Sequence, residues 1–421
     1  MRQWLRRILT KKPWSKRSRG EKIFPHAWAI VLAIYFIFLY VHYVHDDPPA
    51  YDTDLLPVVT HIPDTQNAYS VVMRSAAASR LNSAERYTVI RQIDGAISSA
   101  TVVQGYVARS TETLALFSEL ARRSAMQEPN LAVPSFPGSG AEPPYWAVYS
   151  AAQLSLLRAD VLARQGRITE ALEIYLTIVD VGRIFAKGPK LLDGLVGMGL
   201  IDLGAARARR IVRAGRVDHG RLLAAARRLN AKSGAAEGLQ SAFRYRYREM
   251  AYLHNHQAEL LERLWPKPTP LQRMEIAFAK AGLTNNRPNR WNAWEAAVDR
   301  LLIASAPKVC TTAGLASVDW PPSGLHSHRI AKILAGLTLS ESDNIFRRRC
   351  TTDFLLSSAA VEAAAQAYRS DHGRFPDRLE DLVPRYIPAV PIDAFNGDAP
   401  IYSHHYGTIH SVGKDVDGNP L

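Results

Sequence analysis

The sequence predicts a mainly α-helical protein with an N-terminal transmembrane helix, a domain of helical hairpins and a small α+β module at its C-terminus. Three observations predict this fold class: an uncharged apolar run from Ala27 to Val44, Ala-, Leu- and Arg-rich stretches with helical spacing from about Ser83 to Lys280, and a final part whose short elements are separated by Gly and Pro. The expected parts are a basic cytoplasmic segment (1–22), a transmembrane helix (23–45), a spacer (46–80), an all-α periplasmic domain (81–340) and a C-terminal module (341–421).

The apolar run is the strongest signal in the chain. About 20 apolar residues cross the hydrocarbon core of a bilayer as a helix, and an excess of Lys and Arg keeps one flank in the cytoplasm. Residues 1–22 carry nine Lys or Arg and one Glu, whereas Asp46 and Asp47 follow the run. We therefore expect a single-pass protein of the bacterial inner membrane, with its N-terminus in the cytoplasm and its bulk in the periplasm.

A cleaved signal peptide is the alternative interpretation of the same segment. The apolar region of a signal peptide has roughly 7–15 residues and ends at a cleavage site made of small residues. The run here is longer, and His45-Asp46-Asp47-Pro48-Pro49 follows it. These residues do not suit a signal peptidase, which favours the anchor.

The net charge of +13 does not by itself indicate a nucleic-acid partner. Residues 1–22 contribute +8, nine basic minus one acidic, which leaves +5 for the rest of the chain. The remaining basic clusters fit solvated helix faces; they comprise Arg207, Arg209, Arg210, Arg213 and Arg216, and Arg347, Arg348 and Arg349. The expected partners are the lipid bilayer and envelope proteins, and no nucleic acid.

Two cysteines, Cys310 and Cys350, stand forty residues apart and form no metal-ligand pattern. In an oxidising compartment they can form a disulfide, whose loop closure would stabilise the fold by about 3–4 kcal/mol in the chain-entropy model. Two buried free thiols are the alternative. A bridge would join the end of the helical domain to the start of the C-terminal module.

Within the helical domain, one helix pair has a recognisable form: Tyr145 to Arg164, a turn at Gly166, and Ile168 to Phe185. Small and aromatic residues, Ala171 and Tyr175, follow the turn. The pair resembles one tetratricopeptide hairpin, although Arg158 stands where Leu is usual and no second copy follows at the period of the repeat. A regular solenoid is therefore not predicted.

The stretch from Leu191 to Ala206 is apolar enough to be mistaken for a second membrane span. Asp193 and Asp202 would each cost about 2.5–3.5 kcal/mol within the membrane. We predict instead a buried helix that packs closely through Gly194, Gly197 and Gly199.

The C-terminal module is predicted to begin with a helix of roughly 30 residues ending near His372, whose start is capped by Ser340 with Asp343. One side of this helix is apolar and needs a partner, whereas another side is polar. The apolar side comprises Phe354, Val361, Ala365 and Tyr368, and the polar side Glu362, Gln366 and Arg369. Leu379 and Leu382 make a helical turn, and strands near 401–404 and 408–412 form a hairpin on the apolar side. Tyr368, Phe375 and Phe395 are expected to be largely buried.

The residues that carry a family resemblance occur in the order Tyr368, G-R-F-P (373–376), Leu379, Leu382, P-I-D-A-F-N-G (391–397), Tyr402 and S-V-G-K-D (411–415). In this order they resemble the C-terminal half of the major pseudopilins of type II secretion, over about 70 residues. The resemblance implies a long helix on a small antiparallel sheet. It also implies a calcium ion in the loop after the S-x-G-x-D stretch, where Asp415 matches the acidic residue and Asp417 is adjacent.

The chain also departs from that family. The prepilin-peptidase site is missing, since Gly20-Glu21-Lys22 precedes the apolar run, so the chain is not expected to be processed and polymerised as a pilin. The sequence has no further acidic residues after Asp417. Because calcium needs 6–8 oxygen ligands, Asp415, Asp417 and Asn419 supply only part of a site. A plain Asp-Gly turn is the alternative to a metal site.

No G-x-S-x-G, H-E-x-x-H, P-loop or dinucleotide motif occurs, so no catalytic or cofactor-binding residues are predicted. The histidines to test for chemistry are His326, His328, His404, His405 and His410. His404 and His405 are expected on opposite faces of a strand, in surface roles. The sequence favours an envelope scaffold that binds protein partners alongside a secretion or pilus-type assembly. The alternative is a periplasmic enzyme, a hydrolase, with its active site in the helical domain.

Overall fold

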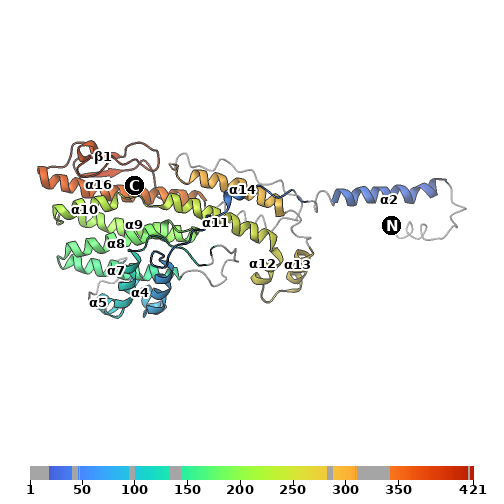
Figure 1. Ribbon diagram of the computed structural model, residues 1–421, viewed down its shortest axis with the longest axis horizontal. Helices are drawn as coiled ribbons and strands as arrows, with labels where there is room; N and C mark the ends of the chain where they lie inside the picture. The colour runs from blue at the N-terminus through green and yellow to red at the C-terminus, as the bar shows by residue number, and fades with distance from the viewer. Residues whose placement is uncertain are drawn as a thin grey trace. The chain divides into compact units, whose positions relative to one another are not determined.

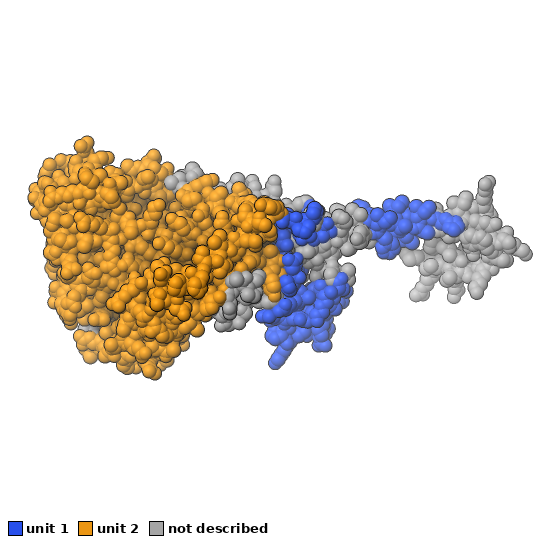
Figure 2. Space-filling model, in the orientation of Figure 1, with its two compact units in different colours: residues 1–50, 254–293, 320–332 blue, residues 51–253, 294–319, 333–421 orange. Residues whose placement is uncertain are grey.

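The computed structural model describes residues 19–39, 46, 48–93, 100–129, 131, 144–281, 288–308, 310, 342–415 and 418–421. These residues are mainly helical, as predicted, and they include one small antiparallel sheet. Figure 2 shows the two compact units of the chain. Unit 1 comprises residues 1–50, 254–293 and 320–332, and unit 2 comprises residues 51–253, 294–319 and 333–421.

Unit 1 contains the N-terminal helix α2 (Arg19–Leu39), which begins four residues before the predicted start at residue 23. Among the residues that the structure describes, no helix combines the length and the apolarity needed to cross a membrane. Unit 1 also contains a hairpin of α12 (Gln257–Leu264) and α13 (Pro270–Lys280). Helix α13 begins where the sequence dictates, because Thr269 and Gln272 form a capping box and Pro270 occupies the first turn.

Two long helices contribute to both units: α11 (Ala235–Asn255) and α14 (Pro288–Ser305). The prediction of one all-α domain over 81–340 is therefore too simple. Residues 254–293 belong to unit 1, and among those that the structure describes (254–281 and 289–293) no side chain is part of the large buried core of unit 2.

Unit 2 starts earlier than predicted. Its first elements are η3 (Thr53–Leu55), α3 (Tyr69–Ala78), α4 (Ser83–Ile93), α5 (Ala100–Arg109) and α6 (Thr111–Leu120). The predicted spacer over 46–80 is wrong for this part, since α3 is a regular helix that packs on α6 and α7. Val71 and Val72 of α3 are fully buried, and their burial in the core gives the physical reason.

The centre of unit 2 is built from α7 (Tyr145–Arg164), α8 (Ile168–Ala186), α9 (Leu191–Arg213) and α10 (His219–Leu229). The predicted helix pair is confirmed almost to the residue, and Gly166 makes its turn with a positive φ of 80°. Helix α8 packs between α7 and α9, and Figure 1 shows these long helices side by side. The predicted buried helix at 191–206 is also confirmed, extended to Arg213.

Glycines bring the backbones of α8 and α9 into direct contact. A Cβ atom on Gly197 would lie 2.1 Å from the backbone N of Ala186, and one on Gly182 would lie 2.8 Å from the carbonyl oxygen of Gly197. Gly194 has no such role, because a Cβ atom there meets nothing within 4 Å. Close packing therefore depends on Gly197 and not on every glycine of the helix.

The C-terminal module has the predicted elements. Helix α16 (Ser342–His372) has 31 residues and ends at the predicted His372, and η4 (Leu379–Leu382) follows it. Strands β1 (Ile401–Ser403) and β2 (Thr408–His410) form an antiparallel hairpin in which Tyr402 pairs with Ile409. The hairpin packs on α16 through β2, and Figure 1 shows the hairpin, labelled β1, beside this helix. Phe354, Val361 and Ala365 are buried, whereas Tyr368 and Phe375 are only half-buried.

The module is not a separate domain, contrary to the predicted boundary at 341. Helix α16 packs against α9 and α10 on the side that the hairpin does not cover. Two residues of the predicted polar side of α16 are therefore interior, since Glu362 is 2% exposed and Gln366 is buried, whereas Arg369 is exposed as predicted. Ala359, Ala360, Ala363 and Ala364 are fully buried as well, because small side chains let helices approach on several sides at once.

Candidate functional site

The junction between α16 and the helical layers contains a buried ionic cluster that the sequence reasoning missed. Glu362 of α16 accepts hydrogen bonds from two arginines of α9. Arg209 Nη2 lies 2.8 Å from Glu362 Oε1, and Arg213 Nε lies 2.8 Å from Glu362 Oε2. A carboxylate with two guanidinium partners satisfies its oxygens away from water, so the pairing fixes the register of α16 on α9.

The interpretation of the basic clusters as solvated helix faces is wrong for several of their arginines, which pair with carboxylates. Arg207 pairs with Asp160, Arg348 with Asp202, and Arg349 with Asp353. Arg210, Arg216 and Arg347 are exposed, in accordance with the interpretation. The four-residue spacing of Arg209 and Arg213 was the available signal, because it places both side chains on one face of a helix.

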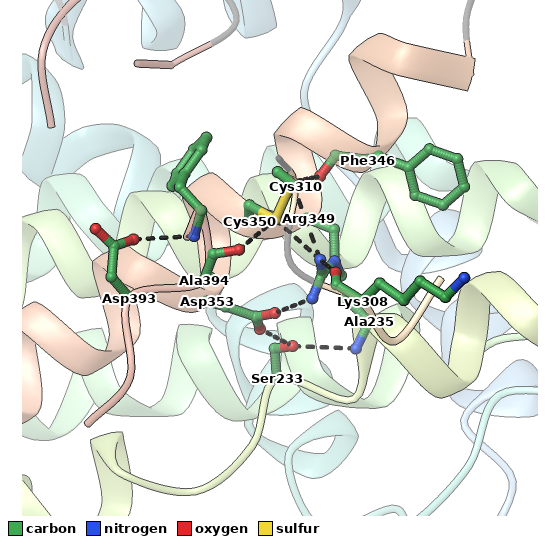
Figure 3. Close-up of polar contacts among 11 residues, drawn as sticks. Ser233, Ala235, Lys308, Cys310, Phe346, Arg349, Cys350, Asp353, Asp393 and Ala394 are labelled. Carbon is green, nitrogen blue, oxygen red and sulfur yellow. Dashed lines mark hydrogen bonds and ion pairs between the residues drawn. A yellow bond between two sulfur atoms is a disulfide. The ribbon is translucent and has the colours of Figure 1, made fainter. Parts of the chain in front are cut away.

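A disulfide joins Cys310 to Cys350 at the start of α16, with a Cα to Cα distance of 6.3 Å. Figure 3 shows Arg349 beside it, with Nη2 2.9 Å from Cys350 Sγ. Arg349 also donates to the carbonyl oxygen of Lys308 and to Asp353 Oδ2. Burial lowers the pKa of Arg349 and raises the pKa of Asp353. The disulfide and the arginine together tie Cys310 and Lys308 to α16.

The segment P-I-D-A-F-N-G lies against this disulfide. The backbone N of Cys310 donates to the carbonyl oxygen of Ala394 over 3.1 Å, and Figure 3 shows Ala394 next to the bridge. The Asp393 carboxylate accepts hydrogen bonds from Ser411 Oγ and from the backbone N of Val412. Phe395 is buried beside Gly413, where a Cβ atom would lie 2.2 Å from the ring. The two motifs of the C-terminal module therefore form one hydrogen-bonded unit.

Several large apolar side chains are exposed in the hairpin and in the segments next to it. They are Ile401 in β1, Tyr406 in the turn, Val412 after β2, and Ile392 in the segment before β1. His404 and His405 do not lie on opposite faces of a strand, as predicted. They occupy the turn between β1 and β2, where their ring centroids are 3.9 Å apart, because the strand ends at Ser403. His410 is also exposed, and it pairs in register with Ile401.

The predicted metal ligand Asp415 takes part in a turn. Its carboxylate accepts hydrogen bonds from the backbone N of Asn419, over 2.8 Å, and from the Asn419 side chain. Asp417, His326 and His328 lie outside the described residues. In the part of the chain that the structure describes, no group of three or more His, Cys, Asp or Glu side chains is arranged to hold a metal ion. The calcium site therefore stays a prediction.

The helical domain contains a second polar cluster, at the start of α9. Lys190 Nζ lies 2.8 Å from Glu128 Oε2, and Tyr145 donates to Asp193 Oδ1 over 2.7 Å. The backbone N of Lys190 donates to the second oxygen of Asp193. Burial raises the pKa of Asp193 to about 7. This cluster caps α9. It also brings a lysine and two carboxylates together in the helical domain, where the alternative prediction of a hydrolase places the active site.

Comparisons with protein-family models, with curated proteins and with solved structures give no significant match to this chain.

Proposed function

We propose that this protein is a membrane-anchored scaffold of the bacterial envelope. Its N-terminus is cytoplasmic, and its periplasmic helical domain and C-terminal module bind protein partners of a secretion or pilus-type assembly. The observation that carries the proposal is that α16 packs against both the β1–β2 hairpin and α9. This packing makes the C-terminal module a rigid extension of the helical domain. The pseudopilin resemblance supports the link to secretion.

The anchor is supported by the side chains of α2. Nine large apolar residues are 48–63% exposed and point in all directions around the helix, since they are nearly consecutive. They are Trp28, Ile30, Val31, Leu32, Ile34, Tyr35, Phe36, Ile37 and Phe38. A helix that is apolar all round is stable when hydrocarbon surrounds it. The Cys310–Cys350 disulfide supports a compartment outside the cytoplasm, since cytosolic disulfides are rare.

A topology experiment tests the anchor. Alkaline phosphatase fused after Thr60 should be active, because that enzyme folds only outside the cytoplasm. The matched control fusion, after Lys22, should be inactive. An inactive Thr60 fusion that is expressed at a normal level would contradict the orientation and the compartment.

A second experiment tests partner binding at the hairpin. Ile401 and Val412 are 59% and 57% exposed, so Ile401→Glu with Val412→Glu should leave the fold intact while it removes contacts to envelope proteins. Site-specific photo-crosslinking from Tyr406 in the full chain would measure those contacts. Val58→Glu is the control, because Val58 is an apolar side chain that is exposed, at 79%, elsewhere in unit 2. Crosslinks that persist in the double variant would exclude this face as the binding surface.

The alternative function, a periplasmic hydrolase, would place its active site at the Lys190 cluster. Glu128 and Asp193 already accept hydrogen bonds there from Lys190 and Tyr145. A catalytic base must instead be able to reach a substrate proton. Because both carboxylates are already hydrogen-bonded, the scaffold is favoured. The variant Lys190→Met separates the two functions. A hydrolase should lose its activity on a panel of substrates while its crosslinks to partners are retained.

A further inference from the structure

Helix α13 carries an exposed apolar stripe. Leu271, Met274 and Phe278 are 62%, 46% and 43% exposed, and their spacing of three and four residues places them on one face of the helix. Ile276 lies on the opposite side and is buried. The stripe is therefore not the face with which α13 contributes to the core of its own unit. Leu264, at the end of α12, adds a further exposed side chain.

Contacts within unit 1 connect this hairpin to the end of the N-terminal apolar segment. Asp46 Oδ2 accepts a hydrogen bond from the backbone N of Asn289, over 2.9 Å, at the start of α14. Two residues further, the Trp291 ring stacks on His254 with centroids 6.1 Å apart. His254 is three residues before Gln257, the first residue of α12, and three residues span at most about 11 Å. The hairpin thus begins close to Asp46, which follows the proposed membrane helix.

The charges of the hairpin indicate what covers the stripe. Residues 257–280 contain four basic and three acidic residues, so their net charge is +1. Arg263 pairs with Glu259 and Lys280 with Glu262, which leaves little charge for an ionic partner. An apolar stripe on a short helix of low net charge beside a membrane anchor fits the interfacial zone of a bilayer, which takes apolar side chains to a depth of about 5–10 Å.

We propose that α13 lies in the outer interfacial zone of the bilayer, with Leu271, Met274 and Phe278 inserted among the lipids. This second membrane contact rests on the proposed membrane anchor. It would hold unit 1 against the lipid surface, so that the chain is attached at α2 and at α13. Because the net charge is small, insertion depends on apolar burial and is independent of anionic lipids and of salt.

Site-specific photo-crosslinking in native membranes tests the proposal with the full chain. A diazirine amino acid replaces Met274 in one variant, Arg273 in a second and Ile34 of α2 in a third. Arg273 is the matched control, because it is exposed on the same helix but about 100° away from Met274. Mass spectrometry then identifies whether each position becomes attached to lipid, to protein or to neither.

The proposal expects lipid adducts at Met274 at a several-fold higher yield than at Arg273, unchanged by high salt. Adducts of Met274 with protein, or equal yields at Met274 and Arg273, would overturn it. The Ile34 variant separates the two proposals. Lipid adducts at Ile34 without lipid adducts at Met274 would refute the interfacial helix alone, whereas an absence of lipid adducts at both positions would refute the anchor as well.

Discussion

Glu362 of α16 and Arg213 of α9 form a hydrogen-bonded ion pair across 149 residues of sequence, with Arg213 Nη2 2.6 Å from Glu362 Oε1. The two ends of the pair differ in environment, because the Glu362 side chain is 2% exposed and that of Arg213 is 50% exposed. The carboxylate is thus the member that depends on its partner, while the guanidinium can still reach water. Arg209 pairs with the same carboxylate, and its side chain is less exposed than that of Arg213.

Removing both arginines should destabilise the protein far more than removing either one. In the double variant Arg209→Met and Arg213→Met, the buried Glu362 loses its charged partners, which should cost about 3–5 kcal/mol of unfolding free energy. Arg213→Met alone leaves Arg209 in place and should cost much less. Urea unfolding followed by tryptophan fluorescence measures these values. Adding Glu362→Leu to the double variant should restore most of the loss, and the exposed Arg216→Met is the neutral control.

Two glycines of α9 should respond to alanine with opposite signs. Gly197→Ala places a Cβ atom 2.1 Å from the backbone N of Ala186, so α8 and α9 must separate, at a cost of at least about 2 kcal/mol. Gly194→Ala meets nothing within 4 Å and should stabilise the helix by about 0.5–1 kcal/mol. Thermal unfolding of the two variants measures both effects, and equal melting temperatures would show that the helices are not in backbone contact.

The disulfide should contribute measurably to stability. Its loop spans 40 residues, for which loop-closure entropy predicts about 3–4 kcal/mol. Reduction of the wild type should lower the unfolding free energy by that amount, and the variant Cys310→Ala with Cys350→Ala should no longer respond to the reductant. Thiol counting on denatured, unreduced protein should find no free thiol. Two free thiols would remove the bridge and with it the support for an oxidising compartment.

Stability should fall as the pH rises through neutrality because of Asp299. Burial raises the pKa of this carboxyl from 3.8 to about 7, opposed by Arg246 and reinforced by Glu295. The folded protein therefore binds the proton more tightly than the unfolded chain, so this contribution is fully present below pH 3.8 and is lost as the pH rises through 7. Each pKa unit of the increase corresponds to about 1.4 kcal/mol.

Asp299→Asn should remove this part of the pH dependence. Asn resembles the protonated carboxyl, so the unfolding free energies of the wild type and the variant, measured between pH 5 and pH 8, should be similar on the acidic side, and the wild type should become the less stable of the two as the pH rises. A variant whose slope equals that of the wild type would show that Asp299 keeps its ordinary titration and that Arg246 holds it ionised.

Several features could be predicted from sequence because local interactions decide them. The turn at Gly166 ends α7 and starts α8, and Gly373 ends α16 with a φ of 76°, which side chains with a Cβ atom disfavour. The strands on either side of Gly407 follow from Gly and Pro punctuation and alternation, and both lie where predicted. These signals depend on residues that are close in the sequence, so the elements can be predicted without knowledge of the fold.

The partners of α16 could not be predicted in the same way. The sequence of α16 shows one apolar side, and Glu362 and Gln366 led us to expect that the other side faces solvent. In the structure α9 and α10 pack on that other side, because the alanines of α16 are small enough to let these helices approach. Whether a charged side chain faces solvent depends on an opposite charge far away in sequence, here Arg209 and Arg213. The sequence by itself determined the helix pair α7 and α8, the end of α16 and the hairpin, because local signals set them. The tertiary structure decided that α3 is a packed helix and which polar side chains are buried, since both depend on contacts over long range.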